Sequence, residues 1–167
     1  MVSLSSAPAA FAACDSGSSG GLSVSSTDCA PLKKARIVRG KAIAPASAPA
    51  RVKKVIAAAN RIRNKPYIYG GGHGRLNDRG YDCSGSVSYA LRAGGFVKGS
   101  MPSGGYIRWK RKGIGRWITT YANGGHMYMV VAGISFDTSN MGGKKGNRWS
   151  TTIRSSKGFS ARHPGNY

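Results

Sequence analysis

The sequence predicts an α+β fold in which N-terminal helices pack on a C-terminal antiparallel sheet. Apolar residues recur at helical spacing over residues 51–62, and a second helical pattern follows over residues 83–93. From about residue 116 onward the period changes to that of strands. Helices that come before the strands, rather than alternating with them, favour this class over an α/β fold.

The first expected helix, over residues 51–62, has one apolar face and one face of Lys and Arg. Pro66 stands just beyond it and prevents its continuation. The second helix is expected over residues 83–93, with Asp82 as its N-terminal cap and Gly94 at its end. Both helices therefore have clear start or stop signals.

Four strands are expected in the C-terminal half, over residues 116–121, 127–132, 135–138 and 149–153. The run 127–132 is apolar at successive positions, which predicts a central strand that is buried on both faces. Residues 144–148 are expected to form a basic turn, and the pattern after residue 155 predicts no element.

Basic and aromatic residues alternate ahead of the strands, around Trp109. Such interleaving is typical of proteins that bind nucleic acid by stacking and charge. It also fits a solvated rim with Trp109 in the core, which is the interpretation we favour. The glycine-rich loop 70–74 lacks the Gly-Lys-Ser/Thr ending of a phosphate-binding P-loop. Its His73 is interpreted as a loop histidine that can line a cleft.

Residues 1–50 form a low-complexity N-terminal segment, and residues 51–167 form the expected folded domain. Leu4 to Ala13 fit the end of a signal peptide, although no basic residue precedes them. Residues 15–50 are rich in Gly, Ser, Ala and Pro, which predicts a flexible linker. The N-terminal segment therefore gives weak support for export.

The 167 residues include 26 Lys and Arg against five Asp and no Glu, for a formal net charge of +21. This surplus indicates a polyanionic partner, either nucleic acid or an anionic cell wall or membrane surface. Of the three cysteines, Cys14 and Cys29 can pair in an oxidising compartment and leave Cys83 free. The spacing of Cys and His predicts no metal site, no organic cofactor is implied, and no stretch is long enough for a transmembrane segment.

Cys83 lies where a loop becomes the second helix, in the sequence Asp-Cys-Ser-Gly, and His126 opens the apolar run 127–132. A thiol is mostly protonated at pH 7 and needs activation before it attacks a carbonyl. The first turn of a helix and a nearby imidazolium both stabilise a thiolate. The alternative is that Cys83 is a small buried hydrophobe and His126 a structural histidine. The residues that flank them favour the catalytic interpretation.

Three elements lie in order within about residues 51–140, and they are Pro66-Tyr67-x-Tyr69-Gly70-Gly71, Asp82-Cys83-Ser84-Gly85, and Gly125-His126 before an apolar strand. Together they resemble the NlpC/P-sixty family of papain-like cysteine peptidases, which cut peptidoglycan stem peptides. The resemblance implies a papain-like fold, with Cys83 as nucleophile, His126 as general base and Tyr67 near the oxyanion. It also implies that Asp82 and Ser84 help to bind the free amine of the stem peptide.

The chain departs from the family pattern in two places. The loop between Tyr69 and Cys83 is longer by a few residues, and the third polar residue, commonly a histidine in the family, is not a histidine here. If residues 127–132 and 135–138 are antiparallel neighbours, Phe136 and Asp137 point to opposite faces. Phe136 suits the core, so we predict that Asp137 faces the cleft and orients the imidazole of His126. A role for His163 instead, or for neither residue, remains the alternative.

The sequence therefore predicts a secreted or cell-wall-associated bacterial cysteine endopeptidase, monomeric, that acts on peptidoglycan and binds anionic cell-wall polymers. One alternative is an amidase or acyltransferase on the same fold. The other is a basic module that binds wall polymer or nucleic acid and whose thiol is incidental. The motifs at Cys83 and His126 favour an enzyme over a pure binding module, and nucleic acid is the less favoured partner.

Overall fold

The computed structural model describes residues 34–141 and 147–167. Its helices are α1 (Ala50–Ile62), α2 (Cys83–Ala93) and the short α3 (Ser103–Tyr106). The strands of the main sheet are β3 (Arg111–Lys112), β4 (Ile118–Ala122), β5 (Met127–Val131), β6 (Ile134–Phe136), β7 (Trp149–Ser150) and β8 (Ser160–His163). They form a six-stranded antiparallel sheet in the order β3-β8-β4-β5-β6-β7. The predicted α+β class is confirmed.

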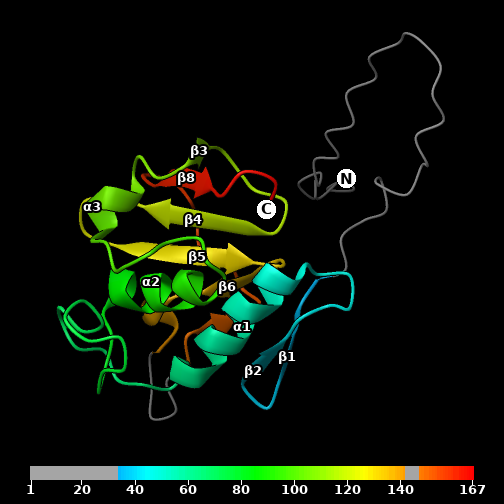
Figure 1. The fold of residues 1–167 in the computed structure, drawn as a ribbon, viewed down its shortest axis with the longest axis horizontal. Coiled ribbons are helices and arrows are strands. Elements are labelled where there is room, and N and C mark those ends of the chain that lie inside the picture. Colours follow the sequence, from blue (N-terminus) through cyan, green and yellow to red (C-terminus); the bar gives the residue numbers. More distant parts are fainter. Residues whose placement is uncertain (1–33, 142–146) are drawn as a thin grey trace, which may run out of the picture. The chain divides into compact units, whose positions relative to one another are not determined.

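The two long helices lie together beside the sheet (Figure 1). Helix α1 packs on α2, and α2 packs in turn on β5. The apolar side chains expected on one face of α1 are all buried in the core, and they are Val52, Val55, Ile56, Ala59 and Ile62. Helix α2 runs over the predicted residues, and Gly94 caps its C-terminal end.

Strand β5 lies between β4 and β6, so the predicted central position is confirmed. Its residues Met127 and Met129 are completely buried. Ala132 and Gly133 both have positive φ, of 47° and 78°, as the central residues of the tightest hairpin turns require. This turn brings β6 back beside β5, with Phe136 opposite Met129.

The linker prediction is wrong for residues 34–50. Two strands in this range, β1 (Arg36–Val38) and β2 (Lys41–Ile43), form a separate two-stranded sheet. The backbone N–H and C=O of Ala42 both bond the side chain of Asn60 on α1, at 2.9 Å each, and Ala42 is buried in the core. Small alanine side chains allow this close approach, although their frequency is also typical of linkers. The expected signal segment, Cys14 and Cys29 lie outside the described residues.

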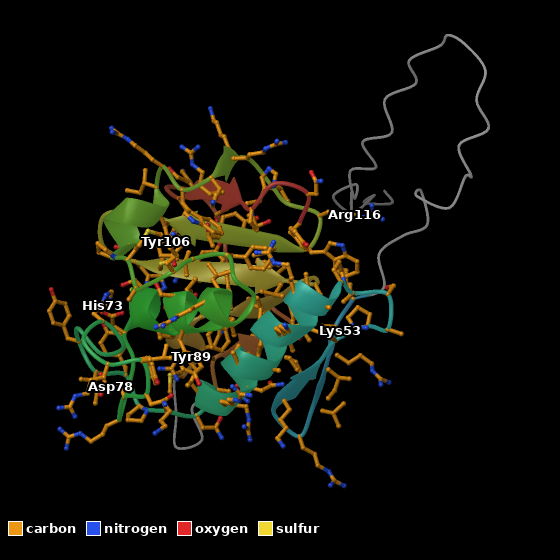
Figure 2. All side chains as sticks on the ribbon, in the orientation of Figure 1. Lys53, His73, Asp78, Tyr89, Tyr106 and Arg116 are labelled. Atoms are coloured by element: carbon orange, nitrogen blue, oxygen red, sulfur yellow. The ribbon has the colours of Figure 1, made fainter. Side chains whose placement is uncertain are left out.

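Four further elements have no counterpart in the sequence prediction, namely α3, β3, the 3₁₀ helix η1 (Thr138–Met141) and β8. Strand β8 bridges β4 and β3, with Arg162 opposite both Thr120 and Lys112. Tyr106, which is labelled in Figure 2, is fully buried, and Trp109 is 7% exposed. These two rings therefore belong to the core and offer no stacking surface to nucleic acid. Within the two described ranges, no helix combines the length and hydropathy needed to cross a membrane.

Candidate active site

Cys83 is the first residue of α2, and the residue before it caps the helix. The Asp82 carboxylate accepts a hydrogen bond from the backbone N–H of Gly85 through Oδ1, at 2.6 Å. Its other oxygen, Oδ2, accepts from the N–H of Gly70, at 3.1 Å. Asp82 thus joins the glycine-rich loop to the start of α2 and holds Cys83 at the junction. The Cys83 thiol is free and mostly buried.

His126 stands immediately before β5, and a polar turn holds its backbone. The Asn123 side chain accepts hydrogen bonds from the N–H groups of Gly125 and His126, at 3.0 and 2.8 Å. The ring nitrogen Nε2 lies 2.8 Å from Oδ1 of Asp137. Hydrogen bonds first with Asp137 and second with Cys83 raise the pKa of His126 to about 9. Because Asp137 occupies Nε2, the nitrogen left for Cys83 is Nδ1.

Asp137 directly follows β6, which ends at Phe136. Its backbone N–H bonds the carbonyl of Arg148 on the adjacent segment, and the side chain is almost fully buried. Burial opposes ionisation, but hydrogen bonds from His126 and from the N–H of Ser139 outweigh it and hold the pKa of Asp137 below its ordinary value. At neutral pH the ionised carboxylate of Asp137 is therefore hydrogen-bonded to the protonated imidazole of His126.

The structure thus brings Cys83, His126 and Asp137 into one chain of contacts, while their catalytic roles remain predictions. The alternative residue, His163, lies on β8, where its Nδ1 is 2.8 Å from the carbonyl oxygen of Gly165. Its strand pairs with β3 and β4, and its ring bonds its own C-terminal turn.

Arg154 is a second cation at Asp137 that the sequence did not reveal. Its Nη1 lies 3.3 Å from Oδ2 of Asp137 and 3.1 Å from Oγ of Ser139. The guanidinium also lies near the rings of Tyr128 and Phe159, at 5.8 and 5.4 Å from their centroids. Arg154 therefore occupies the carboxylate oxygen that His126 leaves open. Its segment carries no strand or helix signal, so nothing local predicted this contact.

A cavity of about 470 Å³ opens beside Cys83. Its lining comes from the glycine-rich loop, the start of α2, the start of α3 and the turn before His126, and includes Tyr67, Tyr69, Gly70, His73, Asp82, Cys83, Ser84, Pro102, Ser103, Gly124 and Gly125. Tyr67 is half exposed. Burial, and then the negative charges of Cys83 and Asp82, raise the pKa of the Tyr67 phenol. Tyr67 therefore stays a neutral O–H donor close to the thiol.

Arg148 is completely buried, so it is not the exposed residue of a basic turn that the sequence predicted. Residues 144–146 of that expected turn lie outside the described residues. The guanidinium of Arg148 donates to the carbonyls of Ile62, Lys65 and Tyr81, at 2.8, 2.6 and 3.0 Å. Burial lowers the pKa of Arg148 to about 10, so it stays charged at neutral pH. The side chain ties the end of α1 to the segment that leads into Cys83.

No group of three or more His, Cys, Asp and Glu with the geometry of a metal site exists among residues 34–141 and 147–167.

Neither a scan against protein-family models nor a search of curated proteins found a match. Among solved structures, a similar chain is the P60 domain of an antigen from M. avium subspecies paratuberculosis. It is 24% identical in sequence, with a TM-score of 0.48, and the alignment covers 67% of this chain and 93% of that chain. Similarity of this degree establishes no family, so the functional inference rests on the residues of the site.

Proposed function

We propose that this protein is a cysteine endopeptidase of the NlpC/P-sixty type, with a papain-like fold, that hydrolyses amide bonds in peptidoglycan stem peptides. The observation that supports it most is the contact chain from Cys83 through His126 to Asp137, beside an open cavity. Three separate segments of the chain supply these residues. A buried structural cysteine needs neither the charged imidazole nor the carboxylate behind it.

In the first half of the reaction, the Cys83 thiolate attacks the carbonyl carbon of the amide and a C–S bond forms. The oxyanion accepts a hydrogen bond from the backbone N–H of Cys83, at the start of α2, and Tyr67 lies close by. The imidazolium of His126 then gives its Nδ1 proton to the leaving nitrogen. The C–N bond breaks, the amine departs and a thioester remains on Cys83.

In the second half, a water molecule attacks the thioester carbonyl. Neutral His126 takes a proton from this water, and collapse of the tetrahedral intermediate breaks the C–S bond. The carboxylic acid product leaves, and Cys83 returns as a thiolate beside the imidazolium. Asp137 holds the imidazole in one orientation throughout and stabilises its positive charge.

The net charge of +21 supports a cell-wall location for this enzyme. Peptidoglycan-bearing walls carry anionic polymers, and a strongly basic protein is attracted to such a surface without a specific pocket. We accordingly propose that the protein acts outside the cytoplasm, as a monomer bound to the wall by charge.

The test is digestion of purified peptidoglycan with analysis of the fragments by mass spectrometry. Wild-type protein should release peptides with a new amine and a new carboxylate at one bond. Cys83→Ala should lower turnover by about 10³-fold or more, because no nucleophile remains. It should leave the fold intact, as measured by circular dichroism. Unchanged turnover in Cys83→Ala would refute the proposal, and transfer of the acyl group to an added amine would indicate an acyltransferase instead.

A further inference from the structure

Arg154 lies in the segment that joins β7 to β8, where residues 151–158 are all exposed. Its side chain is 42% exposed, yet its guanidinium reaches the carboxylate of Asp137, which is only 2% exposed. Nη1 lies 3.3 Å from Oδ2 of Asp137 and 3.1 Å from Oγ of Ser139. An exposed segment therefore places a permanent positive charge at the buried end of the contact chain that starts at Cys83.

The imidazole of His126 and the guanidinium of Arg154 share their surroundings. Nε2 of His126 lies 2.8 Å from Oδ1 of Asp137, so the two groups contact different oxygens of one carboxylate. The hydroxyl of Ser139 contacts both, at 3.3 Å from Nε2 and 3.1 Å from Nη1. The ring centroid of Phe159 lies 6.3 Å from that of the imidazole and 5.4 Å from the guanidinium carbon. These contacts fix the guanidinium relative to the imidazole.

The charges around the imidazole change when Cys83 is acylated. Within the described part of the chain, the titratable groups that interact with the imidazole and its carboxylate include Cys83, Tyr128 and Arg154. Burial raises the pKa of Tyr128 to about 12, so its phenol stays neutral. Before acylation, the imidazole faces two anions, a thiolate and the carboxylate of Asp137. In the thioester the sulfur carries no charge, and the charges of Asp137 and Arg154 offset each other.

We propose that Arg154 is a positioning residue that acts through Asp137: it holds the carboxylate against the imidazole of His126 and offsets its charge, so that the imidazole is neutral when the thioester is hydrolysed. This inference rests on the proposed function, in whose second half neutral His126 takes a proton from water. Beside a carboxylate without a second cation, an imidazole keeps its proton to higher pH. Arg154 therefore lowers the pH at which hydrolysis of the thioester reaches its full rate.

Three substitutions separate the charge of Arg154 from its packing. Arg154→Met keeps a long side chain but removes the charge, whereas Arg154→Lys keeps the charge. Lys157→Met is the matched control, because it removes an equal charge from an exposed position of the same segment. A charge within hydrogen-bonding distance commonly shifts a pKa by about one unit or more, and partial exposure to solvent weakens the effect.

The experiment measures how fast an acetyl group leaves Cys83 of the full chain at a series of pH values. p-Nitrophenyl acetate transfers its acetyl group to the thiolate and releases p-nitrophenolate, and the excess reagent is then removed. Water hydrolyses the thioester to acetate and the free thiol. The mass of the Cys83 peptide reports the fraction that is still acetylated.

In wild type, the rate of deacetylation should rise with pH and reach a plateau as His126 loses its proton. In Arg154→Met, the midpoint of this rise should lie higher by about half a pH unit or more, which lowers the rate about threefold below the midpoint. Arg154→Lys and Lys157→Met should keep the wild-type midpoint within about 0.2 pH unit. His126→Gln should lose the rise, which assigns it to the imidazole.

An unmoved midpoint in Arg154→Met would overturn the proposal, even if the rate falls at every pH, because loss of a packing contact alone has that effect. An equal shift in Arg154→Lys or in Lys157→Met would also overturn it, since the charge beside Asp137 is then not the cause. The thermal unfolding midpoint shows whether each variant is folded. If Arg154→Met does not fold, Arg154→Gln replaces it, with the same expected shift.

An acetyl group is not a stem peptide, so the outcome is independent of the natural substrate. Cleaved peptidoglycan together with an unmoved midpoint would refute this inference alone. Intact peptidoglycan together with an Arg154-dependent midpoint would refute the proposed substrate alone. A wild-type Cys83 that takes up no acetyl group would overturn both.

Discussion

The cleft beside Cys83 and the outer surface of the protein hold their charged groups in different ways. At the candidate site, the carboxylate of Asp82 in the cavity lining and the buried carboxylate of Asp137 each accept several hydrogen bonds that fix their direction. On the outer surface, Arg111 and Lys112 are exposed on the short strand β3, and Lys112 lies opposite another cation, Arg162. Geometry therefore sets what the cleft recognises, whereas net charge alone sets what the surface attracts.

After the loss of the nucleophile itself, the largest effect is expected at Asp137, because it holds the imidazole of His126 in place. Asp137→Ala should lower turnover by about 10²-fold or more, as loss of the residue that orients a catalytic base does in such relays. His163→Ala is the matched control and should be nearly silent, since the His163 ring bonds Gly165. Steady-state hydrolysis of a stem peptide measures both. If Asp137→Ala is active and His163→Ala is inactive, then His163 on β8, and not Asp137, is the residue that supports catalysis.

Arg148 should matter through the backbone that it supports. Arg148→Met removes the donors to the carbonyls of Ile62, Lys65 and Tyr81 and leaves these buried acceptors without their partner. The free energy of unfolding should fall by about 3 kcal/mol or more. Arg61→Met, on the exposed side of α1, is the control and should change it by less than about 0.5 kcal/mol. Urea unfolding compares the two, and similar losses would show that Arg148 has no special role.

The ion pair between His126 and Asp137 also predicts how the free energy of unfolding depends on pH. The pKa of His126 rises from its ordinary 6.5 to about 9 in the folded protein, so folding favours the protonated ring. This stabilisation is complete below about pH 6.5 and is lost as the pH rises through about 9, and it amounts to at most about 3 kcal/mol. Urea unfolding between pH 6 and pH 10 should show this fall in wild type and a flatter profile in His126→Gln. If wild type and His126→Gln lose stability equally between pH 6 and pH 10, the ion pair between His126 and Asp137 does not supply this stabilisation.

The smallest effects are expected from single sites on the outer surface. Binding to isolated cell walls should weaken steeply with salt, because exposed charges are screened beyond ~8 Å at 0.15 M. Arg111→Gln with Lys112→Gln on β3, and Lys54→Gln with Arg61→Gln on α1, remove equal charge from different places. Each pair should weaken binding by about the same factor, about twofold. A cosedimentation assay in which one pair dominates, or in which binding survives molar salt, would indicate a specific site instead.

The parts of the fold that were predicted have local signals, and the missed parts depend on distant partners. Helix α2 was placed correctly because Asp82 caps it and Gly94 ends it. Strand β8 was missed because Ser-Ala-Arg-His has no alternating pattern and pairs with β4, about 40 residues earlier in the chain. Arg148 was assigned to a basic turn because its carbonyl partners lie more than 60 residues away.

The residues of the candidate site likewise divide into those with a local sequence signal and those without one. Sequence motifs pointed to Cys83 and His126, and strand alternation predicted that Asp137 faces the cleft. In the structure Asp137 is almost fully buried and contacts the ring of His126, and the roles of all three residues stay predictions. The contacts of His73 and Arg154 followed from no pattern, because each depends on a loop conformation that only the folded chain defines. Contacts that depend on a loop conformation are thus harder to predict than groups that a motif or strand alternation marks.

The most direct test of the central claim is the rate at which Cys83 is alkylated at pH 6, read from the mass of its peptide. A thiolate paired with the charged imidazole of His126 at the start of α2 should react faster than free cysteine at this pH. His126→Gln should remove most of the difference. A Cys83 that reacts at the rate of free cysteine, or more slowly, would contradict the account and leave it as a buried structural residue.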